Sequence, residues 1–114
     1  EMCIRDRSKV ARLILGLKRR GKGVVVVTHD VEFAAQIADR IVLMAGGRIV
    51  HEDLTQNILT DKQALRTARL VMPQIPATAT FLIEKGVKLC RIPLLPGRLY
   101  AEVLELLDHY GDEC

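Results

Sequence analysis

Aromatic residues and cysteines are both scarce in this chain of 114 residues. Tryptophan is absent and aromatic residues make up 4% of the sequence, which leaves few platforms for stacking nucleic-acid bases. The three cysteines, Cys3, Cys90 and Cys114, are far apart and odd in number. This pattern argues against a disulfide framework or a zinc site and favours reduced thiols. We therefore expect no metal site and no nucleic-acid partner.

Long apolar runs are also missing. No stretch approaches the roughly 20 apolar residues that a membrane helix needs. The N-terminus lacks the apolar centre and the small-residue cleavage site of a signal peptide. Hydrophobic residues at 49% and charged residues at 27% are instead ordinary for a globular chain. We expect a cytosolic protein with a hydrophobic core.

Positive charge is concentrated near the N-terminus. Residues 1–22 contain eight of the 17 basic residues and two acidic ones, so this end carries +6 whereas the remainder carries −3. The basic residues are not interleaved with aromatic ones, as they often are on a nucleic-acid surface. The pattern predicts a solvated helix face, with the basic residues Arg5, Arg7, Lys9, Arg12, Lys18, Arg19, Arg20 and Lys22.

The first half of the sequence has the pattern of an α/β layer. Apolar residues recur at helical spacing before Gly21, which predicts an amphipathic helix that stops at a glycine. Val24 to Val27 form an unbroken β-branched run, typical of a strand buried on both faces in a parallel sheet. Such a strand needs neighbouring strands, and residues 1–23 do not supply them. The apolar residues of the helix are Val10, Leu13, Ile14 and Leu17.

The segment after the valine run predicts a helix and a hairpin. Asp30 is a suitable N-cap for a helix from Val31 to about Ala38. Two strands, Ile41 to Ala45 and Arg48 to Glu52, flank a pair of glycines and are typical of a β-hairpin. The order helix, buried strand, helix and hairpin favours an α/β fold.

The second half predicts a small, mainly helical appendix. Thr60 to Gln63 fits a capping box that opens a helix to about Arg69. Pro73 and Pro76 mark the start of another helix, which ends near Gly86. Pro93, Pro96 and Gly97 then mark a loop. A last helix follows, with the apolar residues Tyr100, Val103, Leu107 and Tyr110 and a stop at Gly111.

Three polar residues, Thr28, His29 and Asp30, directly follow the valine run. In α/β sheets ligands bind beyond the carboxyl ends of strands, and the N-terminus of the next helix attracts anions. An imidazole held there can donate a hydrogen bond to a phosphate oxygen. This chemistry suits contact with the terminal phosphate of a nucleotide. The spacing fits equally a histidine that only caps the helix or fills the edge of the core.

A metal site is a further alternative for the His29-Asp30 pair. Adjacent histidine and aspartate ligate metals in His-Asp phosphohydrolases, which need additional ligands from other elements. His51 and His109 are available, but they lie in the predicted hairpin and the last helix without partner motifs. These two histidines are therefore predicted to be surface residues.

The stretch VVVVTHDVEFAAQIADRIVLMAGGRIV, from Val24 to Val50, resembles the switch region of ABC transporter ATPases. In that family a strand ends in a Thr-His-Asp turn, and a helix, the tripeptide Ala-Asp-Arg and a hairpin follow in this order. The segments HDVEFAA and ILTDKQALRTARLVMPQI further resemble the ATPases of energy-coupling factor and cobalt/nickel importers. The resemblance covers roughly Ser8 to Leu107, with Asp53 and Met72 where glycine and proline are common in the family.

The resemblance implies an α/β fold in two parts. Residues 8–54 would be the C-terminal part of a P-loop ABC ATPase domain, with its buried strand, helices and β-hairpin. Residues 55–114 would be a helical C-terminal domain for dimerisation. The resemblance also implies that His29 is the switch histidine that contacts the γ-phosphate, with Thr28 and Asp30 as lesser contributors to the nucleotide site. The implied cofactors are ATP and Mg²⁺.

The resemblance further implies an intact protein that hydrolyses ATP to drive uptake of a metal ion or vitamin. Its partners would be a second ATPase subunit, in a homodimer or heterodimer, and a transmembrane coupling subunit. It would lie in the cytoplasm, peripheral on the inner face of the cell membrane. The P-loop, signature motif and magnesium-binding acidic pair are absent from the sequence, so we expect these residues alone to be inactive. The alternative to an enzyme is a non-catalytic dimerisation or regulatory module.

Residues 1–7 match no part of the family. The string MCIRDR, from Met2 to Arg7, resembles a translated transposase sequencing adapter. We therefore expect residues 1–7 to be a non-native segment, and a genuine short N-terminus is the alternative.

Overall fold

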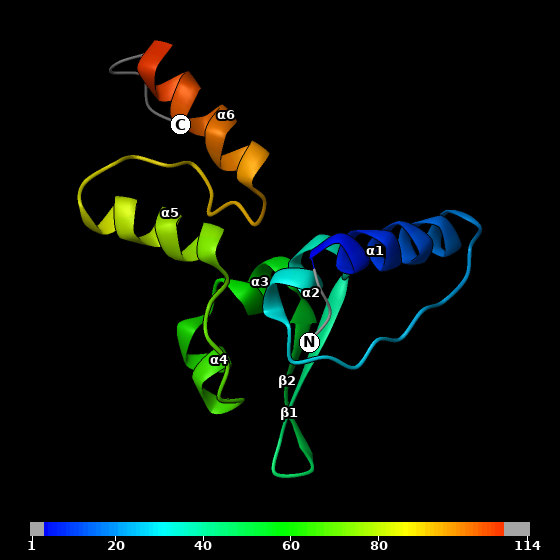
Figure 1. Cartoon of the computed structure of the whole chain (residues 1–114). Coiled ribbons are helices and arrows are strands. Elements are labelled where there is room, and N and C mark those ends of the chain that lie inside the picture. Colours follow the sequence, from blue (N-terminus) through cyan, green and yellow to red (C-terminus); the bar gives the residue numbers. More distant parts are fainter. Residues whose placement is uncertain (1–3, 109–114) are drawn as a thin grey trace.

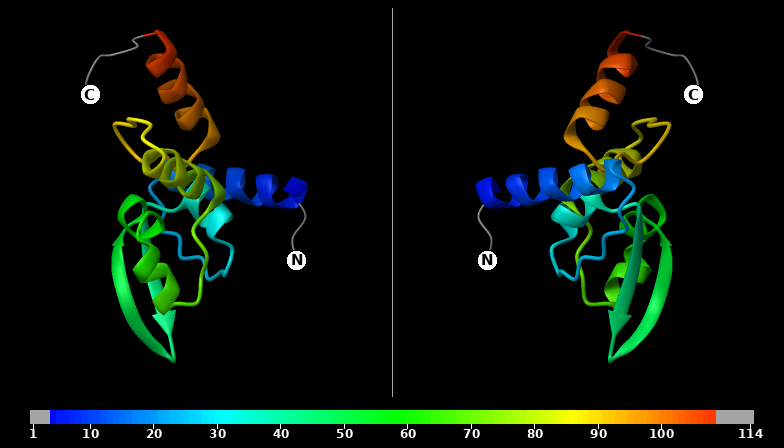
Figure 2. Two further views of the ribbon diagram at one scale, coloured as in Figure 1. Left: turned by 90° about the vertical axis from the view of Figure 1, so that its left-hand side faces the viewer. Right: turned by 90° about the vertical axis from the view of Figure 1, so that its right-hand side faces the viewer.

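The computed structural model describes residues 4–108. Figure 1 shows a β-hairpin at one end of the molecule, a long helix projecting to one side and two further helices at the opposite end. Figure 2 shows the last helix standing away from the rest. The elements in chain order are α1 (Ile4–Arg19), α2 (Val31–Ile37), β1 (Arg40–Ala45), β2 (Arg48–Leu54), α3 (Thr55–Leu59), α4 (Lys62–Thr67), α5 (Gln74–Glu84) and α6 (Pro96–Asp108).

α1 confirms the predicted amphipathic helix and packs on α2. Ala11 and Ile14 form a small buried cluster with Phe33 and Ile37 of α2. The helix ends before Gly21, whose φ of 77° lies in the left-handed region that glycine adopts without steric cost. Leu13, predicted to lie on the apolar face, is instead exposed.

The valine run does not form the buried strand that the sequence predicts. Residues 22–28 are neither helix nor strand, and Val25 and Val27 are 92% and 96% exposed. A strand buried on both faces needs hydrogen-bonded neighbours, and within residues 4–108 the only sheet pairs β1 with β2. The prediction of a strand is therefore wrong for this chain by itself. The exposure of the run agrees with the expectation that residues 1–23 do not supply the neighbouring strands.

β1 and β2 confirm the predicted hairpin. They pair antiparallel from Arg40 opposite Leu54 to Ala45 opposite Arg48, with an irregularity between Leu43 and Met44. The turn glycines 46 and 47 have φ of 58° and 73°, which favours glycine at both positions of a two-residue hairpin loop. Leu43 points into the core on one face of the sheet.

The larger core lies where the hairpin meets α3 and α4. Its buried residues are Leu43, Ile58, Leu59, Ala64 and Leu65. This cluster joins side chains from both sides of the predicted boundary between residues 54 and 55, a boundary that stays a prediction. α3 had no counterpart in the sequence pattern.

The N-cap of α4 is Asp61, so the predicted capping box from Thr60 to Gln63 does not form. Asp61 Oδ1 accepts from the backbone N–H groups of Gln63 and Ala64 at 3.0 and 3.1 Å. The Thr60 hydroxyl donates instead to the Gln56 carbonyl at 2.8 Å, because Thr60 ends α3. Two short helices therefore meet at 60–61, where the sequence predicted the start of one.

The appendix helices α5 and α6 agree with the prediction in number but not in all bounds. α5 follows Pro73 and ends before Gly86, whose φ is 95°. α6 begins at Pro96, so Pro96 and Gly97 lie in its first turn rather than in a loop, as the fixed φ of proline permits. The predicted residues Tyr110 and Gly111 lie outside the described part of the chain.

Two findings concern the features that are scarce in the sequence. Cys90 is disulfide-bonded, so the expectation of reduced thiols is wrong for this residue. None of the helices between residues 4 and 108 is long and apolar enough to cross a membrane.

Candidate functional site

Thr28, His29 and Asp30 form one turn between the exposed valine run and α2. Thr28 Oγ1 accepts a hydrogen bond from the Asp30 backbone N–H at 3.0 Å. Asp30 Oδ1 accepts from the Phe33 N–H at 3.0 Å and so caps α2, as the sequence predicted. The helix start is fixed further because Phe33 is buried. The turn is therefore ordered on its α2 side.

His29 lies at the centre of this turn and is exposed. Among the described residues no hydrogen bond or ion pair engages its imidazole. Both of its neighbours are engaged within the turn, since Thr28 and Asp30 hold the backbone around it. His29 is thus free to donate a hydrogen bond to an external acceptor such as a phosphate oxygen.

α1 holds both ends of α2. At the first end, Arg7 Nη2 lies 2.9 Å from Asp30 Oδ2, and both side chains are about a quarter exposed, at 27% and 25%. At the last end, Lys18 Nζ donates to the Ile37 carbonyl at 2.9 Å and pairs with Asp39 at 2.8 Å. A cation at a helix C-terminus also interacts favourably with the helix dipole. These contacts keep α2, and the turn before it, in place.

The appendix holds α2 from another side through a contact that sequence reasoning missed. Glu32 Oε1 accepts a hydrogen bond from the Gln74 backbone N–H at 2.7 Å. Gln74 is the first residue of α5, and Pro73 before it supplies no side-chain cap. The sequence did carry one signal for this contact. Pro73 stands where a polar N-cap is usual, so an acceptor for the first N–H groups of α5 has to come from another segment.

The structure does not favour a metal role for the His29-Asp30 pair. Both carboxylate oxygens of Asp30 are engaged, one by the Phe33 N–H and one by Arg7. His51 is exposed on β2, opposite Leu43 in the hairpin register, and is not part of this turn. His109 lies outside the described residues.

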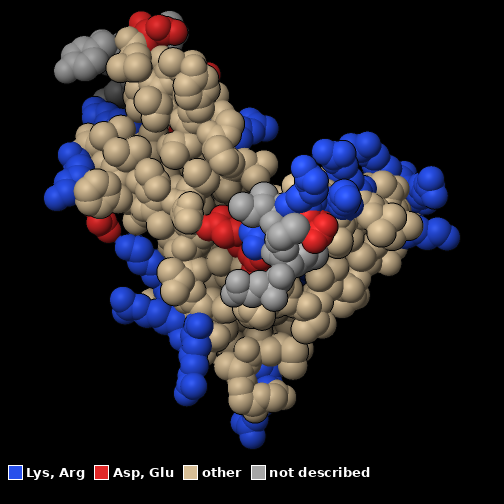
Figure 3. All heavy atoms as spheres, viewed as in Figure 1, with Lys and Arg blue, Asp and Glu red and all other residues tan. Residues whose placement is uncertain are grey.

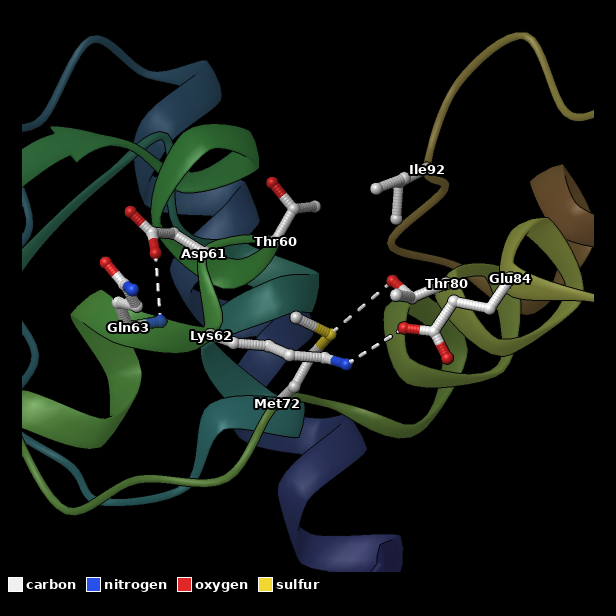
Figure 4. Close-up of a pocket in the computed structure, with 8 residues that line it drawn as sticks. All are labelled: Thr60, Asp61, Lys62, Gln63, Met72, Thr80, Glu84 and Ile92. Atoms are coloured by element: carbon white, nitrogen blue, oxygen red, sulfur yellow. Dashed lines mark hydrogen bonds and ion pairs between the residues drawn. The ribbon is translucent and has the colours of Figure 1, made fainter.

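One hollow in the described surface lies in the appendix rather than at His29. It has a volume of about 440 Å³, and none of residues 28–30 lines it. In Figure 4 the Lys62 and Glu84 side chains meet across it, at 3.6 Å, and the Thr80 hydroxyl points toward the Met72 sulfur at 3.9 Å. Lys62 and Glu84 pair with each other, and the Thr60 and Thr80 hydroxyls donate to the Gln56 and Pro76 carbonyls, so we assign the hollow no ligand.

Basic side chains gather over α1, as the charge pattern predicted (Figure 3). The exposed basic residues of this helix and the turn after it are Arg5, Lys9, Arg12, Arg19, Arg20 and Lys22. They lie away from the contacts that hold α2, which involve Arg7 and Lys18. The bulk of the basic face is therefore a solvated surface.

Curated proteins similar to this chain are transporter ATP-binding proteins. The energy-coupling factor transporter ATP-binding protein EcfA2 of Methanospirillum hungatei is 35% identical over 100 residues, which cover 83% of this chain and 24% of that protein. EcfA of Methanocaldococcus jannaschii is 29% identical over 106 residues, 93% of this chain and 37% of that protein. The cobalt import ATP-binding protein CbiO of Syntrophus aciditrophicus is 35% identical over 82 residues, 72% and 29% of the two chains.

The chain resembles a part of these ATP-binding proteins. It spans between about a quarter and somewhat more than a third of the length of the three relatives named, at 24%, 37% and 29%. No protein-family profile matches it. The similarity extends over most of the chain and confirms the predicted resemblance to energy-coupling factor and cobalt-importer ATPases.

Proposed function

We propose that this chain is the C-terminal part of an ABC importer ATPase subunit that couples ATP hydrolysis to uptake of a metal ion or vitamin. The observation that carries the proposal is the free, exposed imidazole of His29 on an ordered turn at the start of α2. The turn lies in a chain that is 35% identical to EcfA2 of Methanospirillum hungatei over 100 residues. An energy-coupling factor transporter ATP-binding protein and a cobalt import ATP-binding protein both occur among the relatives, which supports importer function.

In this proposal His29 donates its N–H to the terminal phosphate of ATP. Thr28 and Asp30 act mainly by holding the backbone on either side of it, through the bonds Asp30 N–H to Thr28 Oγ1 and Phe33 N–H to Asp30 Oδ1. The exposed imidazole fits an anionic oxygen, and the N-terminus of α2 adds positive potential. The phosphate cradle and the ligands of Mg²⁺ would come from other segments of the longer protein.

Pairing with a second ATPase subunit is supported by α6. This helix has no buried residue, and an apolar stripe is exposed along it at helical spacing, formed by Tyr100, Leu104 and Leu107. A helix that leaves its apolar stripe uncovered favours a partner helix. We propose that residues 55–114 form the pairing region and that a transmembrane coupling subunit binds elsewhere on the longer protein. In this proposal the protein lies in the cytoplasm, on the inner face of the membrane.

The test uses the longer native gene product that contains Ser8 onward, obtained by reading the genomic DNA upstream of this codon. His29→Ala should lower ATP turnover about 100-fold or more, the typical loss when one hydrogen-bond donor to a transition-state oxyanion is removed. Binding of ATP should change little, since the other phosphate contacts remain. His51→Ala, on the exposed hairpin, is the matched control and should keep wild-type turnover.

Wild-type turnover in His29→Ala would contradict the assignment of His29 as the contact to the terminal phosphate. An upstream frame without a P-loop would instead favour the second candidate, a non-catalytic dimerisation or regulatory module. The specific observation in favour of that candidate is the same exposed stripe on α6, which needs no nucleotide site to pair.

A further inference from the structure

Glu32 connects α2, which follows the candidate site, to the first residue of α5. The Glu32 carboxylate accepts the Gln74 N–H at 2.7 Å across 42 residues of sequence. The first N–H groups of a helix have no acceptor inside the helix. Pro73 cannot supply one from its side chain. A carboxylate from α2 therefore takes the place of the N-cap of α5, in a charge-assisted bond of the stronger kind.

Both ends of this contact are anchored in packed structure. Glu32 lies in the first turn of α2, next to Phe33, which is 2% exposed against α1. On the other side, Pro73 and Pro76 are among the largest fully buried side chains, and Ala79 is also fully buried. Packed elements move as units rather than deforming continuously. A shift of the first turn of α2 is thus passed to the start of α5.

The geometry also connects this bond to the pairing region. Glu32 is three residues beyond His29, and Asp30 caps the helix that carries Glu32. α5 in turn contacts α6, whose apolar stripe is exposed. The order of contacts is therefore the His29 turn, α2, Glu32, α5 and α6.

We propose that Glu32 is a positioning residue that couples the nucleotide state of the His29 turn to the orientation of the appendix. The inference rests on the proposed function, because it takes His29 as the phosphate contact. In this scheme contact of His29 with the terminal phosphate shifts α2. The Glu32–Gln74 bond then carries the shift to α5 and α6, where the subunits pair.

The test is amide hydrogen exchange in the longer native protein, with and without Mg²⁺ and a non-hydrolysable ATP analogue. In the wild type we expect the analogue to slow exchange both at residues 28–33 and at residues 74–78, by about tenfold at Gln74, the size of a helix-cap contribution. In Glu32→Ala the effect at 74–78 should disappear while the effect at 28–33 remains. Glu32→Gln keeps an acceptor oxygen, so it should retain part of the slowing of exchange at residues 74–78.

Gln36→Ala is the matched control, since Gln36 is exposed on the same helix. It should behave as the wild type in both segments. The coupling is overturned if residues 28–33 respond to the analogue and residues 74–78 do not, or if 74–78 respond equally in Glu32→Ala. If neither segment responds in the wild type, the proposed function fails and the inference fails with it. If Glu32 were only a structural cap, Glu32→Ala would raise the exchange rate at Gln74 by the same factor with and without the ATP analogue. That result would also overturn the coupling.

Discussion

The division of tasks within the Thr28-His29-Asp30 turn is decided at the scale of single residues. Asp30 uses one oxygen to cap α2 and the other to meet Arg7, so it is a structural residue in this arrangement. Arg7 belongs to the segment expected to be non-native, so the N-cap bond to Phe33 is the contact that identifies Asp30 as structural. His29 is left as the one side chain of the turn that is free for chemistry, and its role as phosphate contact stays a prediction.

Asp53 gives the chain a residue-scale pH dependence. The Leu54 N–H, 2.6 Å from Oδ1, lowers the pKa of Asp53 below its ordinary 3.8, and the side chain of Asn57 and the charge of Arg40 act in the same direction. Because the folded state prefers the ionised carboxyl, its contribution to stability is present above pH 3.8 and is lost as the pH falls through the lowered pKa.

We expect Asp53→Asn to be less stable than the wild type at pH 6, with a difference that shrinks as the pH falls below about 3.8. Urea midpoints at a series of pH values measure it. Glu105→Gln, on the exposed surface of α6, controls for the loss of one carboxylate. A stability difference that is the same at pH 3 and pH 6 would contradict the assignment.

At the scale of elements, α6 is the clearest unpartnered surface. Its apolar stripe of Tyr100, Leu104 and Leu107 is exposed, so a charge placed there leaves the folded monomer intact but enters the proposed interface. We expect Leu104→Glu to weaken self-association about tenfold or more, because burial of a leucine contributes about 1.5–3 kcal/mol. Sedimentation equilibrium measures this change, and circular dichroism checks that the helix content is kept.

Glu105 lies on the same helix beside the stripe, and Glu105→Lys serves as the control for Leu104→Glu. It should associate as the wild type does. An unchanged dissociation constant in Leu104→Glu would show that another surface pairs the subunits, and the assignment of residues 55–114 as the pairing region would then fall.

The whole molecule is less compact than its size leads one to expect. Its radius of gyration is 15.8 Å, against about 13 Å for a compact domain of 100 residues. Its accessible surface is 8805 Å², against roughly 6,200 Å² for a globular monomer of this mass. The valine run and α6 are among the segments that expose large apolar side chains. These segments are the ones that the resemblance places in a sheet and in a subunit contact.

We therefore expect the 114-residue chain, purified by itself, to be marginally stable and prone to aggregate. The double variant Val25→Thr and Val27→Thr should aggregate less while keeping its helix content, since both side chains are more than 90% exposed, at 92% and 96%. Light scattering during thermal unfolding measures the difference. In the longer native protein the same variant should lower stability, because there the two side chains would be buried. A sharp cooperative melt of a soluble wild-type monomer would contradict this expectation.

Much of the local structure could be predicted from the sequence because it depends on near neighbours. The cap of α2 at Asp30, the glycine turn of the hairpin and the stop of α1 before Gly21 each follow from residues a few positions apart. The errors arose where two local signals competed. Asp61 rather than Thr60 caps α4, because Thr60 is used to end the unpredicted helix α3.

The candidate site could be predicted in part. The pattern Thr-His-Asp after four valines indicated the turn and its three residues, and similarity to known transporter ATP-binding proteins confirmed the resemblance that it carried. The contacts of Glu32 and Lys18 with α2 could not be predicted in the same way. Their partners are 42 and 19 residues away. A local sequence pattern does not indicate which distant backbone group lacks a hydrogen-bond partner.

The sequence by itself determined the order of helices and strands, their caps and turns, and the resemblance to importer ATPases, since these depend on side-chain periodicity and on the backbone preferences of single residues. Only the tertiary structure decided that the valine run forms no strand, that one core joins the hairpin to α3 and α4, and that Glu32 caps α5. The physical reason is that burial and long-range hydrogen bonds need a partner surface. A valine run predicts that a strand can form, whereas only a neighbouring strand can bury it.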